Sequence, residues 1–440
     1  MNAVVVAVLV MLILSLLRVN VVFALLIGAL AGGLSGGLSF TDTVTAFTDG
    51  LGEGATIALS YAMLGGFAVA ISRTGIPELL VSSVLKLVNK EGEATRETLA
   101  KALIIFALLI MAIFSQNLIP IHIAFIPLLL PPILHIMNEL RIDRRLIASV
   151  LTFGLVAPYA LLPYGFGLIF HGIIATQMKL AGLPIDMADV PKAMLIPVLG
   201  LLAGLVIAVF ISYRRPREYH IAPTNIEETQ KKTASKKDIV VTILALLAAL
   251  YGQIQTDSMI MGALAGIVVL YLLGAMKWRE ADDVLNAGMR MMAFIGFVII
   301  AGNGFAAVIQ ATGAIEPLVA SMSEVFAGNK GMAAFVMLVA GLMVTMGIGS
   351  SFATIPIIAA IFVPMSVEFG FSTLAIIALV GTSSVLGDAG SPASDSTLGP
   401  TAGLNIDGQH NHIWDTCVPT FIHYNIPMLV FGWVAVMWLA

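Results

Sequence analysis

Long apolar runs, separated by short polar or glycine-rich stretches, recur along the chain. In the first half they fall at about 2–17, 19–38, 55–72, 98–137, 145–178 and 193–213. In the second half they fall at about 239–254, 256–276, 291–311, 331–368, 373–411 and 416–440. A helix of about 20 apolar residues crosses the hydrocarbon core of a bilayer. The pattern therefore predicts an all-α integral membrane protein in which the six segments of the first half correspond to the six of the second.

The fourth and fifth runs of each half are interrupted. Polar tips divide the fourth runs, SQNLIP at 115–120 and GIGSSFATIP at 347–356. Each tip predicts a helix that turns and returns, either as a re-entrant hairpin or as two full crossings. The fifth runs are broken by APYALLPYG at 157–165 and by GDAGSPASDSTLGPTAGLN at 387–405, which we call the opening segment. We therefore expect one hairpin and one broken helix in each half.

An internal repeat relates the two halves directly. The stretch GFAVAISRTGIPELLVSS at 66–83 matches GFAAVIQATGAIEPLVAS at 304–321 at ten of eighteen positions, with a constant offset of 238. The predicted organisation is a first repeat at 1–213, a cytoplasmic linker at 214–238 and a second repeat at 239–440. Chance similarity between two helices of biased composition is the alternative.

Charge placement predicts the orientation of the two repeats, since short cytoplasmic loops are rich in Lys and Arg. If the linker is cytoplasmic and each half makes five crossings, 19 of the 22 basic residues lie inside. The acidic stretch at 40–54 would then be an external loop. Five is an odd number, so the halves have opposite orientations, and we expect the inverted repeats that many secondary transporters use.

Composition supports a membrane protein and excludes several classes of function. Hydrophobic residues make up 59% of the chain and charged residues 11%, against the roughly 25% charged residues of soluble domains. The first run lacks a basic start and a cleavage site, so we expect a first span and not a signal peptide. The sole cysteine, Cys417, excludes an intrachain disulfide. There is no GxxxxGK[ST] motif for ATP-driven transport, and no HExxH motif or nucleophile–base pair, so we do not expect an enzyme.

The opening segment carries the strongest candidate chemistry. Its side-chain oxygens belong to Asp388, Ser391, Ser394, Asp395 and Thr397. Sodium prefers hard oxygen ligands such as carboxylates, hydroxyls and carbonyls. A carboxylate there could exchange a proton for sodium, which is sufficient for antiport. The alternative is a surface loop in which the same side chains are hydrated.

The hairpin tips and a few further residues are weaker candidates for binding ions or a solute. The tip candidates are Ser115, Gln116 and Asn117 in the first half and Ser350, Ser351 and Thr354 in the second. Capping of the returning helix is their alternative role. His122 could handle protons, Tyr159 could face the first break, and Asn303 could bond to the site, although packing would explain each of them. For His410 and His412 we favour a solvated helix end over a proton relay or a metal site.

The run SPASD at 391–395, followed by ST and by HIWDT at 412–416, resembles the SPxSDTT-type signature of the NhaC-type sodium/proton antiporter family, within the ion transporter superfamily. The resemblance implies a cation-binding role for Ser391, Pro392, Ser394, Asp395 and Thr397. It also implies a homodimeric scaffold and a moving transport domain in the bacterial cytoplasmic membrane. The chain departs from the family pattern at Ala389 and Gly390, where His-Cys is frequent. This branch also holds suspected amino-acid permeases, so the departure leaves the substrate open.

The sequence thus predicts an ion-coupled secondary transporter that exchanges sodium for protons by alternating access. The alternative is a sodium- or proton-coupled permease for amino acids or small carboxylates. A channel is disfavoured, because hairpins and inverted repeats belong to alternating access. We expect no cofactor, with sodium as coupling ion or substrate. The expected partners are membrane lipid, small ions or a small solute and a second copy of the chain, and not nucleic acid.

Overall fold

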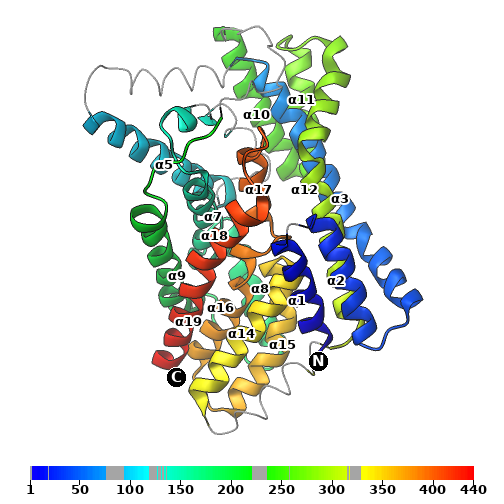
Figure 1. Ribbon diagram of the computed structural model, residues 1–440, viewed down its shortest axis with the longest axis vertical. Helices are drawn as coiled ribbons and strands as arrows, with labels where there is room; N and C mark the ends of the chain where they lie inside the picture. Colours follow the sequence, from blue (N-terminus) through cyan, green and yellow to red (C-terminus); the bar gives the residue numbers. More distant parts are fainter. Residues whose placement is uncertain are drawn as a thin grey trace.

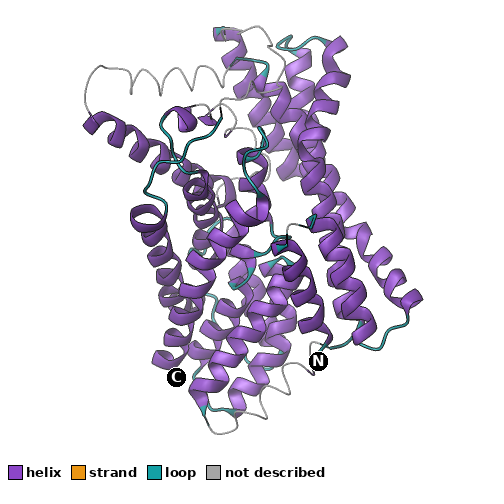
Figure 2. Cartoon of the chain, viewed as in Figure 1, coloured by secondary structure: helices purple, strands orange, loops and turns teal. Residues whose placement is uncertain are grey.

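The computed structural model describes residues 2–17, 19–75, 94–117, 126, 130, 133–134, 136–220, 235–256, 258–314, 317 and 329–440. Helices make up its regular structure, and no strand occurs among these residues (Figures 1 and 2). The helices of the first half are α1 (Ala3–Leu16), α2 (Val21–Ser35), α3 (Phe40–Ser72), α5 (Ala94–Asn117), α7 (Arg144–Leu161), α8 (Phe166–Leu180), α9 (Asp189–Ile207) and η1 (Ala208–Ser212). Those of the second half are α10 (Lys236–Thr256), α11 (Met259–Leu272), η2 (Trp278–Glu280), α12 (Ala281–Ala311), α14 (Lys330–Ile348), α15 (Ser351–Glu368), α16 (Thr373–Val385), η3 (Asp388–Gly390), α17 (Asp395–Leu404), η4 (His412–Cys417), α18 (Val418–Thr420), η5 (Phe421–Asn425) and α19 (Ile426–Leu439).

Seven helical segments of the described chain are long and apolar enough to cross a membrane. They are Thr98–Ser115, Arg144–Leu161, Asp189–Ser212, Lys236–Thr256, Lys330–Ile348, Thr373–Leu404 and His412–Leu439. The prediction of an all-α, multi-pass membrane protein is confirmed. The number of crossings in each half stays a prediction.

The expectation of a loop at 40–54 is wrong, because these residues form the first half of α3. Their location on the external side stays a prediction. The Ser39 side chain caps the helix by accepting a hydrogen bond from the Asp42 amide at 3.0 Å. Val44, Phe47 and Leu51 recur at helical spacing, and Phe47 packs on α12 at Gly304. The helix is therefore long enough to match α12, its counterpart in the second half.

The two long helices α3 and α12 cross through reciprocal glycine contacts. A Cβ atom on Gly50 would lie 2.8 Å from the Asn303 carbonyl oxygen, and one on Gly288 would lie 2.1 Å from the Gly66 amide nitrogen. The offset of 238 converts Gly50 into Gly288 and Gly66 into Gly304, so each contact is the repeat image of the other. The helices run antiparallel, because early residues of α3 meet late residues of α12. This is the reciprocity expected of two inverted copies, although the inversion of the complete halves stays a prediction.

Buried apolar side chains form two clusters. One joins α1, α2 and α3 to α10, α11 and α12. The other joins α5, α7, α8 and α9 to α14, α15, α16 and α19. Figure 1 shows α3, α10, α11 and α12 on one side of the molecule and α5, α9 and α19 on the other. Each cluster takes corresponding helices from both halves, as expected for a scaffold and a transport domain, whose relative movement stays a prediction.

The second hairpin and both broken helices are present, with shorter interruptions than the sequence predicts. Helix α14 ends at Ile348, Gly349 adopts a left-handed φ of 73°, and α15 begins at Ser351. At the base of this hairpin the Lys330 ammonium donates to the Gly370 carbonyl at 2.8 Å. The first break covers 162–165, because α7 continues through Pro158 to Leu161. The second break covers 386–394, because α17 already begins at Asp395.

Candidate functional site

The centre of the site is the point at which α16 stops. The Leu386 amide makes the last helical hydrogen bond, to the Thr382 carbonyl at 2.8 Å. Gly387 then adopts a left-handed φ of 95°, and a Cβ atom there would lie 2.7 Å from the Met346 amide nitrogen. Glycine is therefore needed for both the turn and the close approach of α14. The turn places Asp388 inside the protein, with 8% of its surface exposed.

Hydroxyl groups from three elements converge on the Asp388 carboxylate. The Tyr159 hydroxyl of α7 donates to Oδ2 at 2.7 Å, and the Ser394 hydroxyl donates to Oδ1. Ser351, at the start of α15, lies 2.7 Å from the Tyr159 hydroxyl. Ser396 lies 2.7 Å from the Ser394 hydroxyl and donates to the Asp388 carbonyl at 3.2 Å. Both carboxylate oxygens therefore have hydroxyl donors inside the protein.

The hydroxyls of Ser391 and Thr397 hold the shape of the break. Ser391 donates to the Met346 carbonyl of α14 at 3.0 Å and accepts from the Ala393 amide at 3.2 Å. Thr397 lies 2.6 Å from the Ser391 carbonyl oxygen. Both side chains are fully buried. These predicted ligands thus lie in the same segment as Asp388, where they fix backbone carbonyls.

The two aspartates of the opening segment differ in their surroundings. Asp395 is the first residue of α17 and is partly exposed. The Ser394 hydroxyl caps that helix by accepting from the Ser396 amide at 3.2 Å. A carboxylate in the first turn is stabilised by the positive end of the helix dipole. Asp388 therefore has the more enclosed position of the two.

The second hairpin tip reaches the site through one residue. Ser350 caps α15 by accepting from the Ala353 amide. Ser351 is 1% exposed and contacts Tyr159, whereas Thr354 donates within its own helix to the Ser351 carbonyl at 2.9 Å. Capping and approach to the site thus coexist, as the sequence allows.

The first hairpin tip is only partly described. Ser115 is buried and donates back to the Ala112 carbonyl at 2.9 Å, within α5. Gln116 and Asn117 end that helix, and their side-chain positions lie outside the described residues, as does His122. Asn303 lies in α12, and its carbonyl faces Gly50 at the crossing with α3. Its neighbour Gly302 approaches the side chain of Ala393, so this part of α12 borders the opening segment.

The expectation of a solvated helix end for His410 and His412 is wrong. They are only 2% and 6% exposed. His412 Nε2 donates to the Pro392 carbonyl at 2.9 Å, and its Nδ1 lies 2.8 Å from the Thr401 hydroxyl. His410 Nε2 lies 2.6 Å from the Thr416 hydroxyl. Thr401 of α17 and Thr416 of η4 each supply a hydroxyl partner to one of these buried rings, whereas Nδ1 of His410 has no partner among the described residues.

A buried ion pair, which the sequence does not indicate, lies at the C-terminal end of α17. Both terminal nitrogens of Arg144 bond the Asp407 carboxylate at 2.6 Å. Arg144 Nη1 also donates to the Leu404 carbonyl at 2.9 Å. Burial raises the pKa of Asp407, but the hydrogen bonds and charge of Arg144 outweigh it and hold that pKa below its usual range. The pair therefore fixes the end of α17 to the start of α7.

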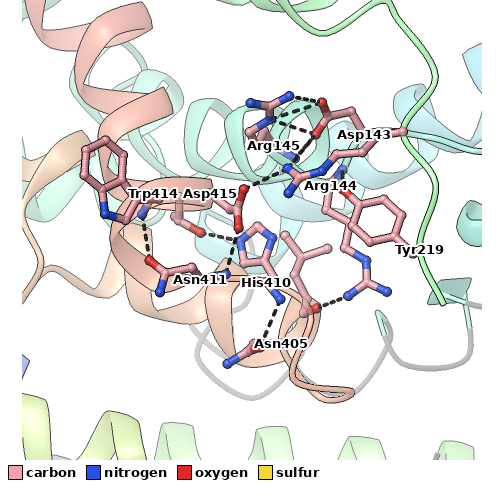
Figure 3. Close-up of polar contacts among 12 residues, drawn as sticks. Asp143, Arg144, Arg145, Tyr219, Asn405, His410, Asn411, Trp414 and Asp415 are labelled. Atoms are coloured by element: carbon pink, nitrogen blue, oxygen red, sulfur yellow. Dashed lines mark hydrogen bonds and ion pairs between the residues drawn. The ribbon is translucent and has the colours of Figure 1, made fainter. Parts of the chain in front are cut away.

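The first residues of the predicted linker pack on this ion pair. The Arg144 amide donates to the Tyr219 hydroxyl at 2.9 Å, and the guanidinium lies 4.2 Å from the centre of that ring. Arg217 donates to Asp415 at 2.8 Å. Figure 3 shows Arg144 and Tyr219 on one side of the cluster, with His410 and Asp415 on the other. Residues 214–220 thus connect the two halves, and most of the remaining linker lies outside the described residues.

Three further residues support the break and the elements beside it. Sequence reasoning missed Thr152 and Gly204, whereas Asn425 stands out in the sequence as a polar residue near the last span. The Thr152 hydroxyl of α7 donates to the Ser396 carbonyl at 2.9 Å. The Asn425 side chain accepts from the Gly387 amide at 2.9 Å. Gly204 of α9 packs directly on the carbonyl of His423. Polar or small residues inside apolar runs are the signal that could have found them.

Two solved structures are similar over most of the chain. One is the YdaH transporter of Alcanivorax borkumensis, with 14% identity, a TM-score of 0.41 and coverage of 90% of this chain and 87% of that one. The other is MtrF of Neisseria gonorrhoeae, described as one of a class of antimetabolite efflux pumps, with 15% identity, a TM-score of 0.41 and coverage of 90% and 84%. Both TM-scores are below 0.5, so neither likeness bears on the function of this chain.

Bacterial relatives match from end to end. An uncharacterized membrane protein of Vibrio parahaemolyticus is 56% identical over 99% of this chain and 100% of its own length. A protein of Bacillus subtilis named "Putative amino acid transporter YuiF" is 54% identical over 99% and 100%. An uncharacterized membrane protein of Haemophilus influenzae is 52% identical over 100% and 99%.

Family models cover both parts of the chain. The model described as the Na+/H+ antiporter family matches residues 150–433, which include most of α7, the second hairpin and the opening segment. A second model, described as a Na+-H+ antiporter family, matches residues 2–88. The sequence resemblance to sodium/proton antiporters is thereby confirmed, and the chain belongs to the Na+/H+ antiporter family.

Proposed function

We propose that this secondary transporter exchanges sodium for protons at Asp388. The observation that carries the proposal is a buried carboxylate at a helix break, within hydrogen-bond reach of Tyr159 and Ser394. A buried charge is costly unless it is paired or hydrogen-bonded. Sodium or a proton can each neutralise the carboxylate, so the two compete for one site. Such competition couples the release of one to the binding of the other.

The surrounding hydroxyls can serve both occupants. A hydroxyl donates through its hydrogen or accepts through its lone pairs, according to its rotation. Ser394 and Ser396 would donate toward the ionised carboxylate and present oxygens when sodium is bound. Ser351 and Tyr159 bring the hairpin tip and α7 to the same point. The carbonyls freed between α16 and α17 supply further oxygen ligands of the kind that sodium prefers.

Alternating access would expose this site to each side in turn. The division of the buried apolar residues into two clusters supports a scaffold and a transport part. The antiparallel crossing of α3 and α12 supports inverted repeats. We further propose a location in the cytoplasmic membrane of a bacterium, since the full-length relatives come from bacteria. The proposed homodimer follows from the family resemblance alone.

An amino-acid permease is the second candidate. The name of the Bacillus subtilis relative, which is 54% identical over its full length, favours it. Helices α15 and α17 both begin beside the break, at Ser351 and Asp395. Helix N-termini attract carboxylates, and Asp388 could pair with an ammonium group. In this case sodium or protons would drive uptake of the solute.

Reconstitution in liposomes that contain a pH-sensitive dye separates the two candidates. Purified protein would receive a pulse of external sodium, first alone and then with a mixture of amino acids. Proton movement with sodium alone, absent in Asp388→Asn, is expected for antiport. Proton or sodium movement only in the presence of amino acids would reject antiport and support the permease. Sodium-driven exchange by Asp388→Asn at the wild-type rate would remove Asp388 from the mechanism.

A further inference from the structure

We propose that Asn425 is the positioning residue for Asp388, and that a π-helical turn packed against Gly204 directs Asn425 toward it. This inference rests on the proposed role of Asp388 in ion binding. It adds a part of the site that lies on the span after the opening segment. Asn425 does not touch the carboxylate itself and acts through the backbone of Gly387.

The contact between Asn425 and Gly387 lies at the point where α16 ends and the break begins. The Gly387 amide is the first beyond the final helical hydrogen bond of α16, and it donates to Asn425 Oδ1 at 2.9 Å. Asn425 is 2% exposed, so this contact lies inside the protein. Gly387 has the left-handed φ of 95° that turns the chain into Asp388. One side-chain oxygen thus holds the peptide unit immediately before the ion-binding carboxylate.

The direction of Asn425 comes from a local change of helix type. Residues Phe421–Asn425 form a π-helical turn, η5, between the α-helical segments α18 and α19. A π-helical turn holds one more residue than an α-helical one, and it rotates the side chains that follow. Such turns occur frequently at functional sites. Here His423 lies 2.8 Å from the Ser212 hydroxyl, Tyr424 donates to the Ser149 carbonyl, and Asn425 accepts from Gly387. Three consecutive side chains therefore reach three different parts of the structure.

Gly204 provides the space for this wider turn. A Cβ atom on Gly204 would lie 1.6 Å from the His423 carbonyl oxygen. No other residue type fits without displacement of η5, because the clash involves backbone and not a flexible side chain. One turn earlier in α9, a Cβ atom on Gly200 would lie 3.0 Å from the Pro427 carbonyl oxygen. Gly200 therefore allows a similar close contact. Gly200 and Gly204 of α9 thus fix the position of the π-helical turn that carries Asn425.

The amide of Asn425 gives an independent indication of its role. Within the described part of the chain, its Nδ2 group has no hydrogen-bond partner. A buried donor without a partner destabilises the folded state. The bond from Oδ1 to the buried Gly387 amide is therefore the contact that favours asparagine over an apolar residue at this place.

The test compares Asn425→Leu with Thr382→Val in the sodium-pulse assay. Leucine keeps the approximate size of asparagine and removes the acceptor. Thr382 is the matched control, because its buried hydroxyl also lacks a partner among the described residues and its loss leaves the Gly387 bond intact. We expect Asn425→Leu to raise the apparent KM for sodium about tenfold, the scale of one net hydrogen bond. The pH at which protons displace half of the sodium should also rise, because a looser turn weakens donation to the carboxylate. Thr382→Val should keep the wild-type KM and pH profile.

Hydrogen exchange of the peptide that contains Gly387 provides a readout that does not depend on transport. Asn425→Leu and Gly204→Ala should both lose protection at this amide, whereas Thr382→Val should retain it. Unchanged protection and an unchanged sodium KM in Asn425→Leu would overturn the inference. If the wild-type protein moves no protons with sodium, the proposed function fails, and the exchange measurement still decides whether Asn425 holds Gly387. If Gly204→Ala does not fold, Asn425→Leu alone decides.

Discussion

Asp388 and Asp395 lie seven positions apart, but their environments give them different roles. Asp388 is enclosed by hydroxyl groups, and Asp395 begins a helix at a partly exposed position. The sequence selects both aspartates because it shows their type and spacing. It does not show which of them the turn at Gly387 directs inward.

We expect Asp388→Asn to reduce sodium-driven proton exchange about 100-fold or more, because an amide neither takes up the proton nor carries the negative charge that sodium neutralises. The variant should remain folded, since asparagine fits the same space. Asp395→Asn should retain measurable exchange with a weaker sodium affinity. Initial rates in liposomes over a range of sodium concentrations measure both effects. An equal loss of exchange in the two variants would contradict the larger role that we assign to Asp388.

Tyr159 connects the hairpin tip to Asp388 through one hydroxyl group. Its ring packs on Phe170 and Phe352, with centroid distances of 5.1 and 5.5 Å. Tyr159→Phe keeps this packing, so its unfolding temperature should stay near that of the wild type. The sodium KM should rise about tenfold, because one donor to the carboxylate is lost. A normal KM would show that the hydroxyl is only structural.

His410 should make stability dependent on pH. Burial lowers the pKa of its imidazole to about 3, with Asp415 opposing this and Arg144, His412 and Arg217 adding to it. In the unfolded chain the pKa is about 6.5. The unfolded state therefore binds the extra proton between these values, and stability falls as pH decreases from about 6.5 toward 3. The loss approaches roughly 1 kcal/mol per pH unit for one proton.

Thermal unfolding in detergent at several pH values measures this effect. His410→Gln should have a flatter profile between pH 6.5 and 4, because glutamine does not titrate. A profile parallel to that of the wild type would assign the acid sensitivity to other groups.

At the scale of the elements, the interruptions were predictable and their bounds were not. Polar residues, glycine and proline within apolar runs indicate a break, which is why 347–356 and 387–405 could be selected. The helices restart earlier than expected because Ser350 and Ser394 cap them. The bond between Arg144 and Asp407 joins residues 263 positions apart and leaves no local pattern. The burial of His412 likewise depends on a threonine of another element.

The Arg144–Asp407 pair should be essential for joining α7 to α17. The two side chains are 0% and 4% exposed. Arg144→Leu would leave the Asp407 carboxylate buried and unpaired, so we expect a loss of roughly 3–5 kcal/mol in stability. The double variant with Asp407→Leu should recover part of this loss. Denaturation in mixed detergent micelles measures both, and equal stability of the single variant and the wild type would refute the prediction.

At the scale of the whole molecule, the crossing of α3 and α12 joins the two halves. The repeat at 66–83 and 304–321 could be read directly from the sequence. The packing of α3 against α12 could not, because Gly50 and Gly288 lie outside the matched stretches. Their role depends on which helices meet, and this is set by the packing of the complete bundle.

The glycines of this crossing provide a matched pair of variants. A Cβ atom on Gly50 would lie 2.5 Å from the Ala307 side chain, whereas one on Gly52 would meet nothing within 4 Å. Gly52→Ala should therefore be neutral or slightly stabilising, because alanine favours the helix. Gly50→Ala and Gly288→Ala should lower the yield and the unfolding temperature of purified protein. Size-exclusion chromatography in detergent and thermal scans would measure this, and an intact Gly288→Ala protein would be the contrary result.

The same crossing has a consequence for biogenesis. The equivalent positions of α3 and α12 are separated by 238 residues of synthesis. When α3 is inserted, Gly50, Gly65 and Gly66 lack the α12 contacts that cover them in the complete protein. Its permanent neighbour enters the bilayer much later, after the linker has been made. Between these events the first half is an incomplete assembly, so a ribosome stalled in the linker should leave a product that membrane proteases remove rapidly.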